Sequence, residues 1–317
     1  MPEIIAANHS TDALNRAIAR LRAGELVAIP TETVYGLAAD ATNGEAVAKI
    51  FATKQRPSFN PLICHVDGVV MAQEYGKFGT VAERLANTFW PGPLTLVVPV
   101  RADSGIHDLV TAGLGSVGLR CPRGFSRQVI SAFGRPLAAP SANRFGQVSP
   151  TTAVDVVADI GDRLDPARDL VLDGGACPVG VESTILDCTT DAPRVLRWGA
   201  IEIAQIEAVG GRPVSADASA IRAPGGLASH YAPRAMVHLG SDAAPGDGFL
   251  ALDSAPTPPG AVRLAQPGDT RAYAAVVYRA LRDADALGLT TVWAQPPDDG
   301  SALAAAVRDR LARAAVR

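Results

Sequence analysis

Residues 26–37 read LVAIPTETVYGL, an apolar run followed at once by a polar loop. The run Leu26–Ile29 predicts a strand, and three hydroxyl groups and one carboxylate follow before Gly36. In α/β proteins ligands bind where strands end, because the strand fixes the position and the loop exposes the side chains. The segment therefore predicts a strand that leads into a binding loop. A turn that only caps the next helix would have the same composition, and the segment alone does not separate the two.

A second segment, Lys54-Gln55-Arg56-Pro57, places two cations two residues apart. The proline favours an extended conformation for Arg56, so both side chains are expected on one side of an extended segment. Such a pair suits a phosphate chain, because arginine binds oxygens bidentately and lysine is a compact charge. An isolated pair of this kind is more often solvated at the surface. Only three of the 29 basic residues are lysines, which favours a specific role for the ammonium group at this position.

The composition bounds the class of protein. With 317 residues, 48% of them hydrophobic, the chain can bury a large core and a smaller second one. A formal net charge of −3 argues against a general nucleic-acid binder, which usually has a strong basic excess. The four cysteines are scattered, which indicates reduced, buried thiols. We find no signal-peptide pattern and no apolar run near ~20 residues, so we expect a cytoplasmic protein without a membrane span.

Helical and strand patterns alternate along the chain. Up to residue 209 we expect helices at 11–22, 45–53, 81–89, 126–133, 153–159 and 201–209, and strands at 26–29, 61–66, 94–100, 117–121, 137–139, 170–172, 185–188 and 195–198. Because several strands follow one another without a helix, the sheet is predicted to be mixed. Farther on we expect strands at 236–239, 249–252, 262–264 and 291–294 and helices at 271–287 and 302–315.

The pattern divides the chain into three parts. Residues 1–209 are predicted to form one large domain, and residues 210–235, rich in glycine, proline, serine and alanine, a linker. Residues 236–317 fit a small open α/β sheet that lacks a GxGxxG fingerprint.

Further motifs follow the first two in order. They are residues 60–66 (NPLICHV), 90–96 (WPGPLTL), 116–122 (SVGLRCP), 139–143 (APSAN), 149–151 (SPT), 182–185 (ESTI) and 195–199 (VLRWG). Together they closely resemble the YrdC-like family of threonylcarbamoyl-AMP synthases, from about Leu14 to Ile201. Pro224-Gly225 and residues 230–233 (HYAP) resemble the linker of the longer, two-domain members.

The resemblance implies a fold and a reaction. The fold would be α/β, with a twisted mixed-sheet YrdC-like catalytic domain and a smaller Rossmann-like C-terminal domain. The reaction would be a nucleotidyl transfer that joins L-threonine, bicarbonate and ATP into L-threonylcarbamoyladenylate and releases pyrophosphate, for the threonylcarbamoyladenosine modification of tRNA. A separate tRNA-modifying transferase would use the product, so stable nucleic-acid binding is not expected. Mg²⁺ would accompany ATP, held mainly by phosphates and water.

The resemblance also implies roles for individual residues. Lys54 and Arg56 would be the catalytic pair at the triphosphate. The other ATP contacts would be Asn60, Ser116, Ser141, Asn143, Ser149, Arg197 and Tyr231, with Ser116 between the two ligands. The L-threonine contacts would be Thr33, His65, Arg120, Ala139 and Ser183. Glu32 and Glu182 are candidates to tune the site, and no residue is assigned as a general base.

Structural roles compete with several of these assignments. Arg120 could form a structural ion pair at a strand end, and His65, on an apolar strand, could be a satisfied core histidine. Ser141 and Asn143 could cap a turn, and Ser183 could be an ordinary strand hydroxyl. The planar guanidinium of Arg120 nevertheless matches the two oxygens of an amino-acid carboxylate.

Tyr231 is expected to act as part of a lid, with the linker returning across the mouth of the site. An ordinary linker tyrosine that packs on its own domain is the alternative. Gly226 stands where a larger apolar residue is usual in the family. The sequence therefore does not determine how the lid closes. We expect the C-terminal domain to position this linker, and a homodimer is a further option.

Two other functions fit parts of the sequence. One is a carbamoyltransferase module of the kind found in hydrogenase-maturation proteins, although the zinc-finger and acylphosphatase-like segments that usually accompany it are absent from this sequence. The other is a double-stranded RNA-binding or ribosome-assembly factor, against which the net charge of −3 argues.

Overall fold

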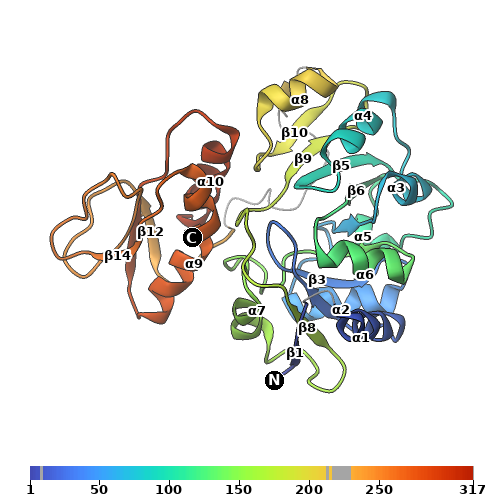
Figure 1. Ribbon diagram of the computed structural model, residues 1–317, viewed down its shortest axis with the longest axis horizontal. Coiled ribbons are helices and arrows are strands. Elements are labelled where there is room, and N and C mark those ends of the chain that lie inside the picture. Colours follow the sequence, from blue (N-terminus) through green and yellow to red (C-terminus); the bar gives the residue numbers. More distant parts are fainter. Residues whose placement is uncertain (8–9, 212–213, 216–229, 317) are drawn as a thin grey trace.

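The computed structural model describes residues 1–7, 10–211, 214–215 and 230–316 (Figure 1). Its larger sheet contains β1 (Glu3–Ala6), β2 (Val27–Ile29), β3 (Gly36–Asp40), β4 (Ile63–His65), β5 (Leu94–Pro99), β6 (Ser116–Arg120), β7 (Leu137–Ala138), β8 (Leu170–Asp173), β9 (Thr184–Asp187), β10 (Arg194–Arg197) and β11 (Val214–Ser215). The helices in this part are α1 (Thr11–Arg22), α2 (Gly44–Lys54), α3 (Val69–Tyr75), α4 (Thr80–Phe89), α5 (Asp108–Thr111), α6 (Phe125–Phe133), α7 (Ala153–Ile160) and α8 (Ile203–Gly210).

Polar side chains fix where several of these helices begin. Ser10 accepts a hydrogen bond from the backbone N–H of Ala13 (3.1 Å), and Asn43 does the same for α2. At α7, Thr152 and Asp155 form a reciprocal capping box. These side chains bind backbone N–H groups of the first turn that have no partner within the helix. The helices therefore begin at the polar residues that the sequence offers as caps.

The larger sheet is mixed and is covered on both faces by helices. Within the described residues its strand order is β1-β8-β2-β3-β7-β4-β6-β5-β9-β10-β11, with parallel and antiparallel neighbours. One buried cluster joins α1 and α6 to one face, and a larger cluster joins α2, α4, α7 and α8 to the other. The mixed sheet that the sequence predicts is therefore confirmed.

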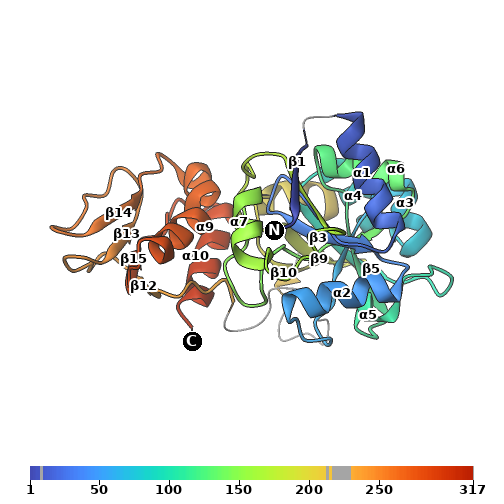
Figure 2. The same cartoon turned by 90° about the horizontal axis from the view of Figure 1, so that it is seen from below.

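The C-terminal part forms a second, parallel sheet. Its strands are β12 (Met236–Leu239), β13 (Gly248–Leu250), β14 (Val262–Ala265) and β15 (Thr291–Ala294), in the order β12-β15-β13-β14. Helices α9 (Thr270–Ala286) and α10 (Ala302–Ala314) face the larger lobe, and this sheet lies on their far side (Figures 1 and 2). The small α/β sheet that the sequence predicts is confirmed.

The two lobes share one apolar cluster. Val34, Val148 and Val181 of the larger lobe are buried in the same cluster as residues of α9 and α10. At Gly180 (φ +78°) the chain touches α9 so closely that a Cβ atom would overlap the carbonyl oxygen of Ala274. Backbone meets backbone there, and only glycine tolerates both the contact and the left-handed conformation.

Some elements were not expected from the sequence. The strand β3 follows the PTETVYGL loop directly and pairs antiparallel with β2, Val27 lying opposite Ala38. Its sequence GLAAD has little intrinsic strand preference, so pairing rather than propensity forms it. The strand β1 and the short helices α3 and α5 were likewise not predicted. In the described part of the chain, no helix combines the length and apolar character needed to cross a membrane.

Candidate active site

Two parallel strands bring His65 and Arg120 together. The strands β4 and β6 pair in register, so His65 lies opposite Arg120 and Ile63 opposite Gly118. Because side chains alternate between the faces of a sheet, Cys64 points into the core while His65 and Arg120 line a small cavity of about 50 Å³. Other sides of this central cavity are formed by Val34, Gly36, Arg56, Ile63, Ala139, Pro140, Ser141, Glu182, Ser183, Arg197, His230 and Tyr231.

Lys54 and Arg56 reach this region, but not on an extended segment as predicted. Lys54 is the last residue of α2, and Gln55 then takes a left-handed conformation (φ 51°) that ends the helix. The ammonium group of Lys54 is buried and donates to the carbonyl oxygens of Ser141 and Asn143. The prediction failed because the helical run continues through Lys54 before Pro57 restricts the chain.

Arg56 is held by carbonyl oxygens as well. It donates to the backbone of Asn60 (3.1 Å) and Pro61 (2.9 Å), and its guanidinium lies over the ring of Phe145. In the described part of the chain, neither Lys54 nor Arg56 forms an ion pair with a carboxylate. Burial lowers the pKa of Lys54 well below its usual value, and the neighbouring charge of Arg56 adds to this. Burial also lowers the pKa of Arg56, to about 10. The pair is a buried positive region that lacks a neutralising acid.

Further predicted residues lie on the loop between β7 and α7 and on the loop before β9. The side-chain amide of Asn143 donates to the carbonyl oxygens of Arg144 and Gln147. Ser149 donates to Glu182 at 2.6 Å. Across the cavity, Ser183 shares a hydrogen bond with Thr95 (2.7 Å) and accepts one from Arg197 (3.1 Å).

Several buried polar atoms around the cavity have no hydrogen-bond partner among the described residues. They are His65 Nδ1, Arg120 Nε, Asn143 Oδ1 and His230 Nδ1. Buried polar atoms are nearly always paired, since an unmet donor or acceptor costs about 1–3 kcal/mol. Four such atoms in one region indicate contacts that a bound molecule would complete. Burial, reinforced by the charge of Arg120, lowers the pKa of His65 well below its usual value, so this imidazole is neutral.

Two buried carboxylates each hold one arginine. Glu32 accepts from Arg120 (2.8 Å) and from the backbone N–H of Arg123 (2.9 Å). Glu182 pairs with Arg310, which comes from α10 in the other lobe (3.1 Å). Burial alone would raise the pKa of both carboxyl groups, but their arginine partners outweigh it, and the pKa of each is lowered. The ion pair that competes with a ligand role for Arg120 thus exists, although its Nε has no partner.

His230 and Tyr231, which lie in the segment predicted to be the linker, line the central cavity. Tyr231 is 1% exposed and has a left-handed backbone (φ 62°); its ring stacks on Tyr278 and lies edge-on to His230. The backbone N–H of Ala232 donates to Gly146 (2.9 Å), which ties the linker end to the loop after Asn143. Pro224, Gly225 and Gly226 lie outside the described residues.

Six of the residues predicted to bind substrates do not line the central cavity, namely Thr33, Lys54, Asn60, Ser116, Asn143 and Ser149. Thr33 is fully buried, bonds to the hydroxyl of Thr31 (2.9 Å) and does not line the central cavity. Ser116 lines a neighbouring cavity of about 10 Å³ that shares Ile63 with the central one. Asn60 contributes its carbonyl oxygen to Arg56.

The sequence did not point to Arg310 or Tyr278. Both come from the C-terminal lobe and contact Glu182, at 3.1 Å for Arg310 and 2.9 Å for Tyr278. Neither belongs to a motif, so only the packing of the two lobes identifies them. His230 lies in one of the motifs but was given no role.

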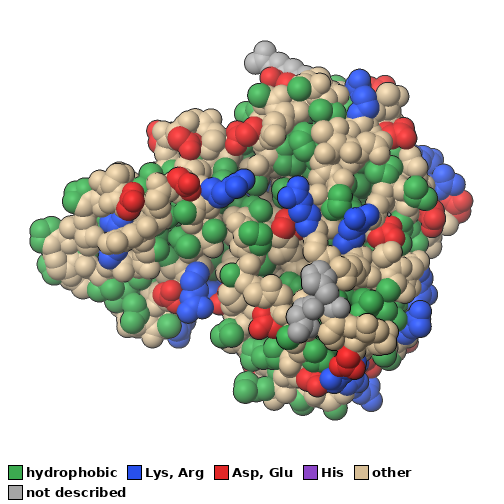
Figure 3. All heavy atoms as spheres, in the orientation of Figure 1, with side chains coloured by type: hydrophobic (Ala, Val, Ile, Leu, Met, Phe, Trp, Pro, Cys, Tyr) green, Lys and Arg blue, Asp and Glu red, His purple; other side chains and the backbone are tan. Residues whose placement is uncertain are grey.

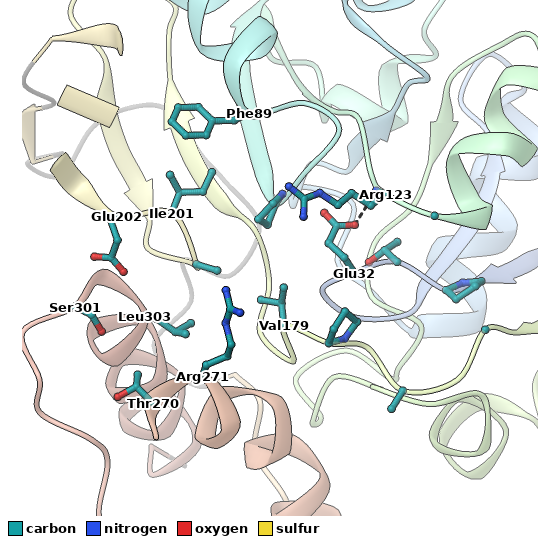
Figure 4. A pocket seen from close by; sticks show the side chains of 18 of the residues that line it. Glu32, Phe89, Arg123, Val179, Ile201, Glu202, Thr270, Arg271, Ser301 and Leu303 are labelled. Carbon is teal, nitrogen blue, oxygen red and sulfur yellow. Dashed lines mark hydrogen bonds between the residues drawn. The ribbon is translucent and has the colours of Figure 1, made fainter. Parts of the chain in front are cut away.

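A larger cavity, of about 1170 Å³, lies between the lobes. Figure 4 shows Arg271 of α9 pointing into it, opposite Arg123 and Glu32 of the other lobe. None of the residues predicted from the sequence to bind a substrate lines it. Glu32 does, so its carboxylate separates this cleft from Arg120 and the central cavity.

Comparisons with known proteins agree with this arrangement. The family model of the Sua5, YciO and YrdC proteins, described as telomere recombination, matches residues 19–199. A second model, described as the C-terminal domain of threonylcarbamoyl-AMP synthase, matches residues 201–316. The threonylcarbamoyl-AMP synthase of Bacillus subtilis is 43% identical over 232 residues, 71% of this chain and 65% of that protein. The one of Pyrococcus abyssi is 40% identical over 225 residues, 68% of this chain and 64% of that protein. The matched segments thus span just under two thirds of these two relatives.

A solved structure matches both lobes at once. The crystal structure of Pyrococcus abyssi Sua5 complexed with L-threonine is 33% identical, with a TM-score of 0.88 over 99% of this chain and 97% of that chain. Escherichia coli YciO, 21% identical with a TM-score of 0.53, shares only the fold over 63% of this chain. Sequence and architecture agree over both lobes, and the chain belongs to the Sua5/YciO/YrdC family, in the two-domain Sua5 form.

Proposed function

We propose that this protein is an L-threonylcarbamoyladenylate synthase, which converts L-threonine, bicarbonate and ATP into threonylcarbamoyl-AMP and pyrophosphate. One observation carries the proposal. Arg56 and Arg120 both line the central cavity, and Lys54 is buried close to Arg56. Among the described residues, no carboxylate forms an ion pair with Lys54 or Arg56, and Nε of Arg120 has no hydrogen-bond partner. An anion of several charges suits Lys54 and Arg56, and a small carboxylate suits Arg120.

The proposed roles follow this division. Lys54 and Arg56 would neutralise the triphosphate, with Asn60, Ser116, Ser141, Asn143, Ser149 and Arg197 as further nucleotide contacts. Arg120 would clamp the carboxylate of L-threonine. Thr33, His65, Ala139 and Ser183 would complete the amino-acid side, with His65 as a neutral hydrogen-bonding group. The matched Pyrococcus abyssi structure is a complex with L-threonine, which supports this choice of amino acid.

The chemistry needs positioning rather than a covalent intermediate. The threonine amine first meets carbon dioxide or bicarbonate to form a carbamate. A carbamate oxygen then attacks the α-phosphorus of ATP, and pyrophosphate leaves from the opposite side. Cations fixed in a dry site stabilise the charge that builds up on the phosphate oxygens, and two substrates held side by side are aligned for in-line attack.

Mg²⁺ is proposed only as a counter-ion of the nucleotide. In the described part of the chain, no three His, Cys, Asp or Glu side chains gather as a metal site would require. Glu32 and Glu182 are each engaged by an arginine. The residues do not fit a protein-built magnesium site, so the phosphates and water would hold the ion.

We also propose that the linker end is a lid. A cavity of about 50 Å³ is far below the ~300–1,000 Å³ of typical ligand pockets, so Tyr231 has to withdraw before both substrates can bind. The division into a catalytic domain (1–209), a linker (210–235) and a C-terminal domain (236–317) is part of this proposal. So are a cytoplasmic location and delivery of the product to a separate tRNA-modifying transferase; dimerisation is left open.

A pyrophosphate-release assay tests the proposal. Purified protein with ATP, Mg²⁺, L-threonine and bicarbonate is expected to release pyrophosphate, and omission of either threonine or bicarbonate is expected to stop the release. Release that is independent of threonine would contradict the proposal, as would release that depends on carbamoyl phosphate.

The RNA-binding alternative gains no support from the face drawn in Figure 3. On the face drawn in Figure 3, basic and acidic side chains are interspersed rather than gathered by sign. A phosphate backbone is held by a continuous basic stripe, which this face does not offer.

A further inference from the structure

Glu182 is the point where the two lobes meet at the site. It is 7% exposed and lines the central cavity. It accepts hydrogen bonds from Ser149 of its own lobe (2.6 Å) and from two residues of the C-terminal lobe, Tyr278 on α9 (2.9 Å) and Arg310 on α10 (3.1 Å). A carboxylate at a pocket wall is thus fixed mainly by groups that lie outside its own domain.

Arg310 is fully buried, does not line the central cavity, and donates from each of its three guanidinium nitrogens to a protein group. Its side chain is 0% exposed. Nε donates to Glu182, Nη1 to Asp309 (3.0 Å) and Nη2 to the carbonyl oxygen of Trp198 (2.9 Å). The guanidinium also lies over the ring of Tyr231. Such a residue acts through its partners rather than by touching the reactants.

The two halves of the site depend on different carboxylates. On the amino-acid side, Arg120 is paired with Glu32, and both belong to the larger lobe. On the nucleotide side, Glu182 accepts a hydrogen bond from Ser149 and interacts electrostatically with Arg197, which also donates to Ser183, a proposed threonine contact. Only the second carboxylate depends on the C-terminal lobe.

We propose that Arg310, assisted by Tyr278, is a positioning residue of the site: it fixes Glu182, and through it Ser149 and Arg197, in the arrangement that receives the nucleotide. The C-terminal domain is then a structural part of the catalytic centre. This inference rests on the proposed function for its kinetic readout, but not for its binding readout.

The charges around Glu182 explain why one arginine matters so much. Burial opposes ionisation of Glu182, and the charges of Arg310 and Arg197 with the Ser149 hydrogen bond outweigh it, which lowers the pKa to about 2. The phenols of Tyr278 and Tyr231 face the same carboxylate, and His230, whose pKa burial lowers to about 3, is neutral beside it. Loss of Arg310 removes the larger of the two arginine charges that oppose the effect of burial, so the pKa of Glu182 rises.

The test compares Arg310→Met with Arg308→Met on the same helix. Arg308 forms an exposed ion pair with Asp298 and provides the matched control. Arg310→Met is expected to raise the KM for ATP and the Kd for a fluorescent ATP analogue at least tenfold, with the KM for threonine changed less than threefold. Arg310→Lys is expected to lie between this variant and the wild type, and Arg308→Met to match the wild type.

A variant that leaves Arg310 in place keeps the test decisive if Arg310→Met folds poorly. Tyr278→Phe removes one hydroxyl and is expected to raise the KM for ATP about threefold. Arg310→Met is expected to move the acid limb of the pH profile to higher pH, because protonation of Glu182 weakens its electrostatic interaction with Arg197. Adding Glu182→Gln to Arg310→Met should remove that limb.

The outcomes separate this inference from the proposed function. If folded Arg310→Met protein keeps wild-type nucleotide affinity and loses only thermal stability, Arg310 is a structural residue and the inference is wrong. Equal rises in both KM values would also overturn it. If the wild type releases no threonine-dependent pyrophosphate but Arg310→Met still weakens nucleotide binding, the proposed function fails and the inference stands.

Discussion

At the scale of single residues, several buried polar groups of the site lack an ion-pair or hydrogen-bond partner among the described residues. Lys54 and Arg56 are held by neutral carbonyl oxygens, and Arg120, His65 and Asn143 each keep one buried polar atom without a described partner. Burying cations without acids costs free energy, which the protein recovers only when an anion binds. This free-energy cost indicates that the site is more stable with an anion bound than without one.

Lys54 is expected to take up a proton when ATP binds. Burial lowers its pKa in the free protein, and a triphosphate beside it restores the charged form, so the complex holds more protons than the free protein above the lowered pKa. ATP affinity should therefore fall as the pH rises through that range. Calorimetry at several alkaline pH values, each in two buffers of different ionisation enthalpy, should give binding heats that differ between the buffers. Lys54→Arg, which stays charged, should give equal heats; equal heats for the wild type would contradict the prediction.

Arg120→Lys is expected to raise the KM for L-threonine about tenfold to a hundredfold, because a charge-assisted hydrogen bond is worth about 1.5–3 kcal/mol and an ammonium cannot bind two oxygens in one plane. The KM for ATP should change little, since Glu32 rather than Glu182 supports this side. Steady-state kinetics with each substrate varied checks both values. Parallel losses for ATP and threonine would show that Arg120 does not act on the amino acid alone.

Sequence reasoning found most of this site, and its failures have a physical reason. His65 and Arg120 alternate with core residues on two neighbouring strands. The sequence motifs and the strand pattern therefore both predict that these two side chains lie together. By contrast, Arg308, Arg310 and Arg313 look alike in the sequence of α10. Only the docking of the helix buries one of them against Glu182 and leaves Arg308 exposed.

At the scale of elements, the proposed lid is held against the cavity by a few contacts. Tyr231 adopts a left-handed conformation that is unfavourable for a side chain with a Cβ atom, by about 1 kcal/mol or more. Its stacking on Tyr278 and the Arg310 contact over its ring hold it there. A segment kept in place by a few contacts against backbone strain can be displaced by ligands.

Tyr231→Ala is expected to lower turnover while the domains stay folded, because the lid then has no ring to close over the substrates. Tyr231→Phe retains the ring and should keep most of the activity. Pyrophosphate release and circular dichroism measure the two effects. Wild-type kinetics in Tyr231→Ala would remove the lid from the proposal.

The elements also show where local sequence falls short of the fold. Helices with polar caps, such as α1 and α10, are predicted to within a residue or two. The strand β3 and the turn that follows Lys54 were not predicted, because strand pairing and the left-handed Gln55 decide them. Neither feature is visible in residue preferences.

At the scale of the whole molecule, the two lobes behave as one packed body. Their apolar side chains share a cluster, and Glu182, Arg310 and Tyr278 join them through buried polar contacts. The backbone N–H of Ala302 at the start of α10 also donates to Glu202 of the larger lobe (2.9 Å).

A single cooperative unfolding transition is therefore expected. Separating the lobes would expose the apolar cluster that they share. It would also break the ion pair between Glu182 and Arg310, which costs free energy. Calorimetry should give a ratio of calorimetric to van't Hoff enthalpy near one. Two resolved transitions would mean that the lobes fold independently, as would full activity of a chain truncated at about Val209.

The contact between Gly180 and the carbonyl of Ala274 has a consequence for protein engineering. Backbone atoms form this contact on both sides. Side-chain substitutions therefore cannot change the distance between the two lobes at this point. A hybrid that grafts the C-terminal half of a relative onto this N-terminal half should assemble only if the donor helix has the same path at that point.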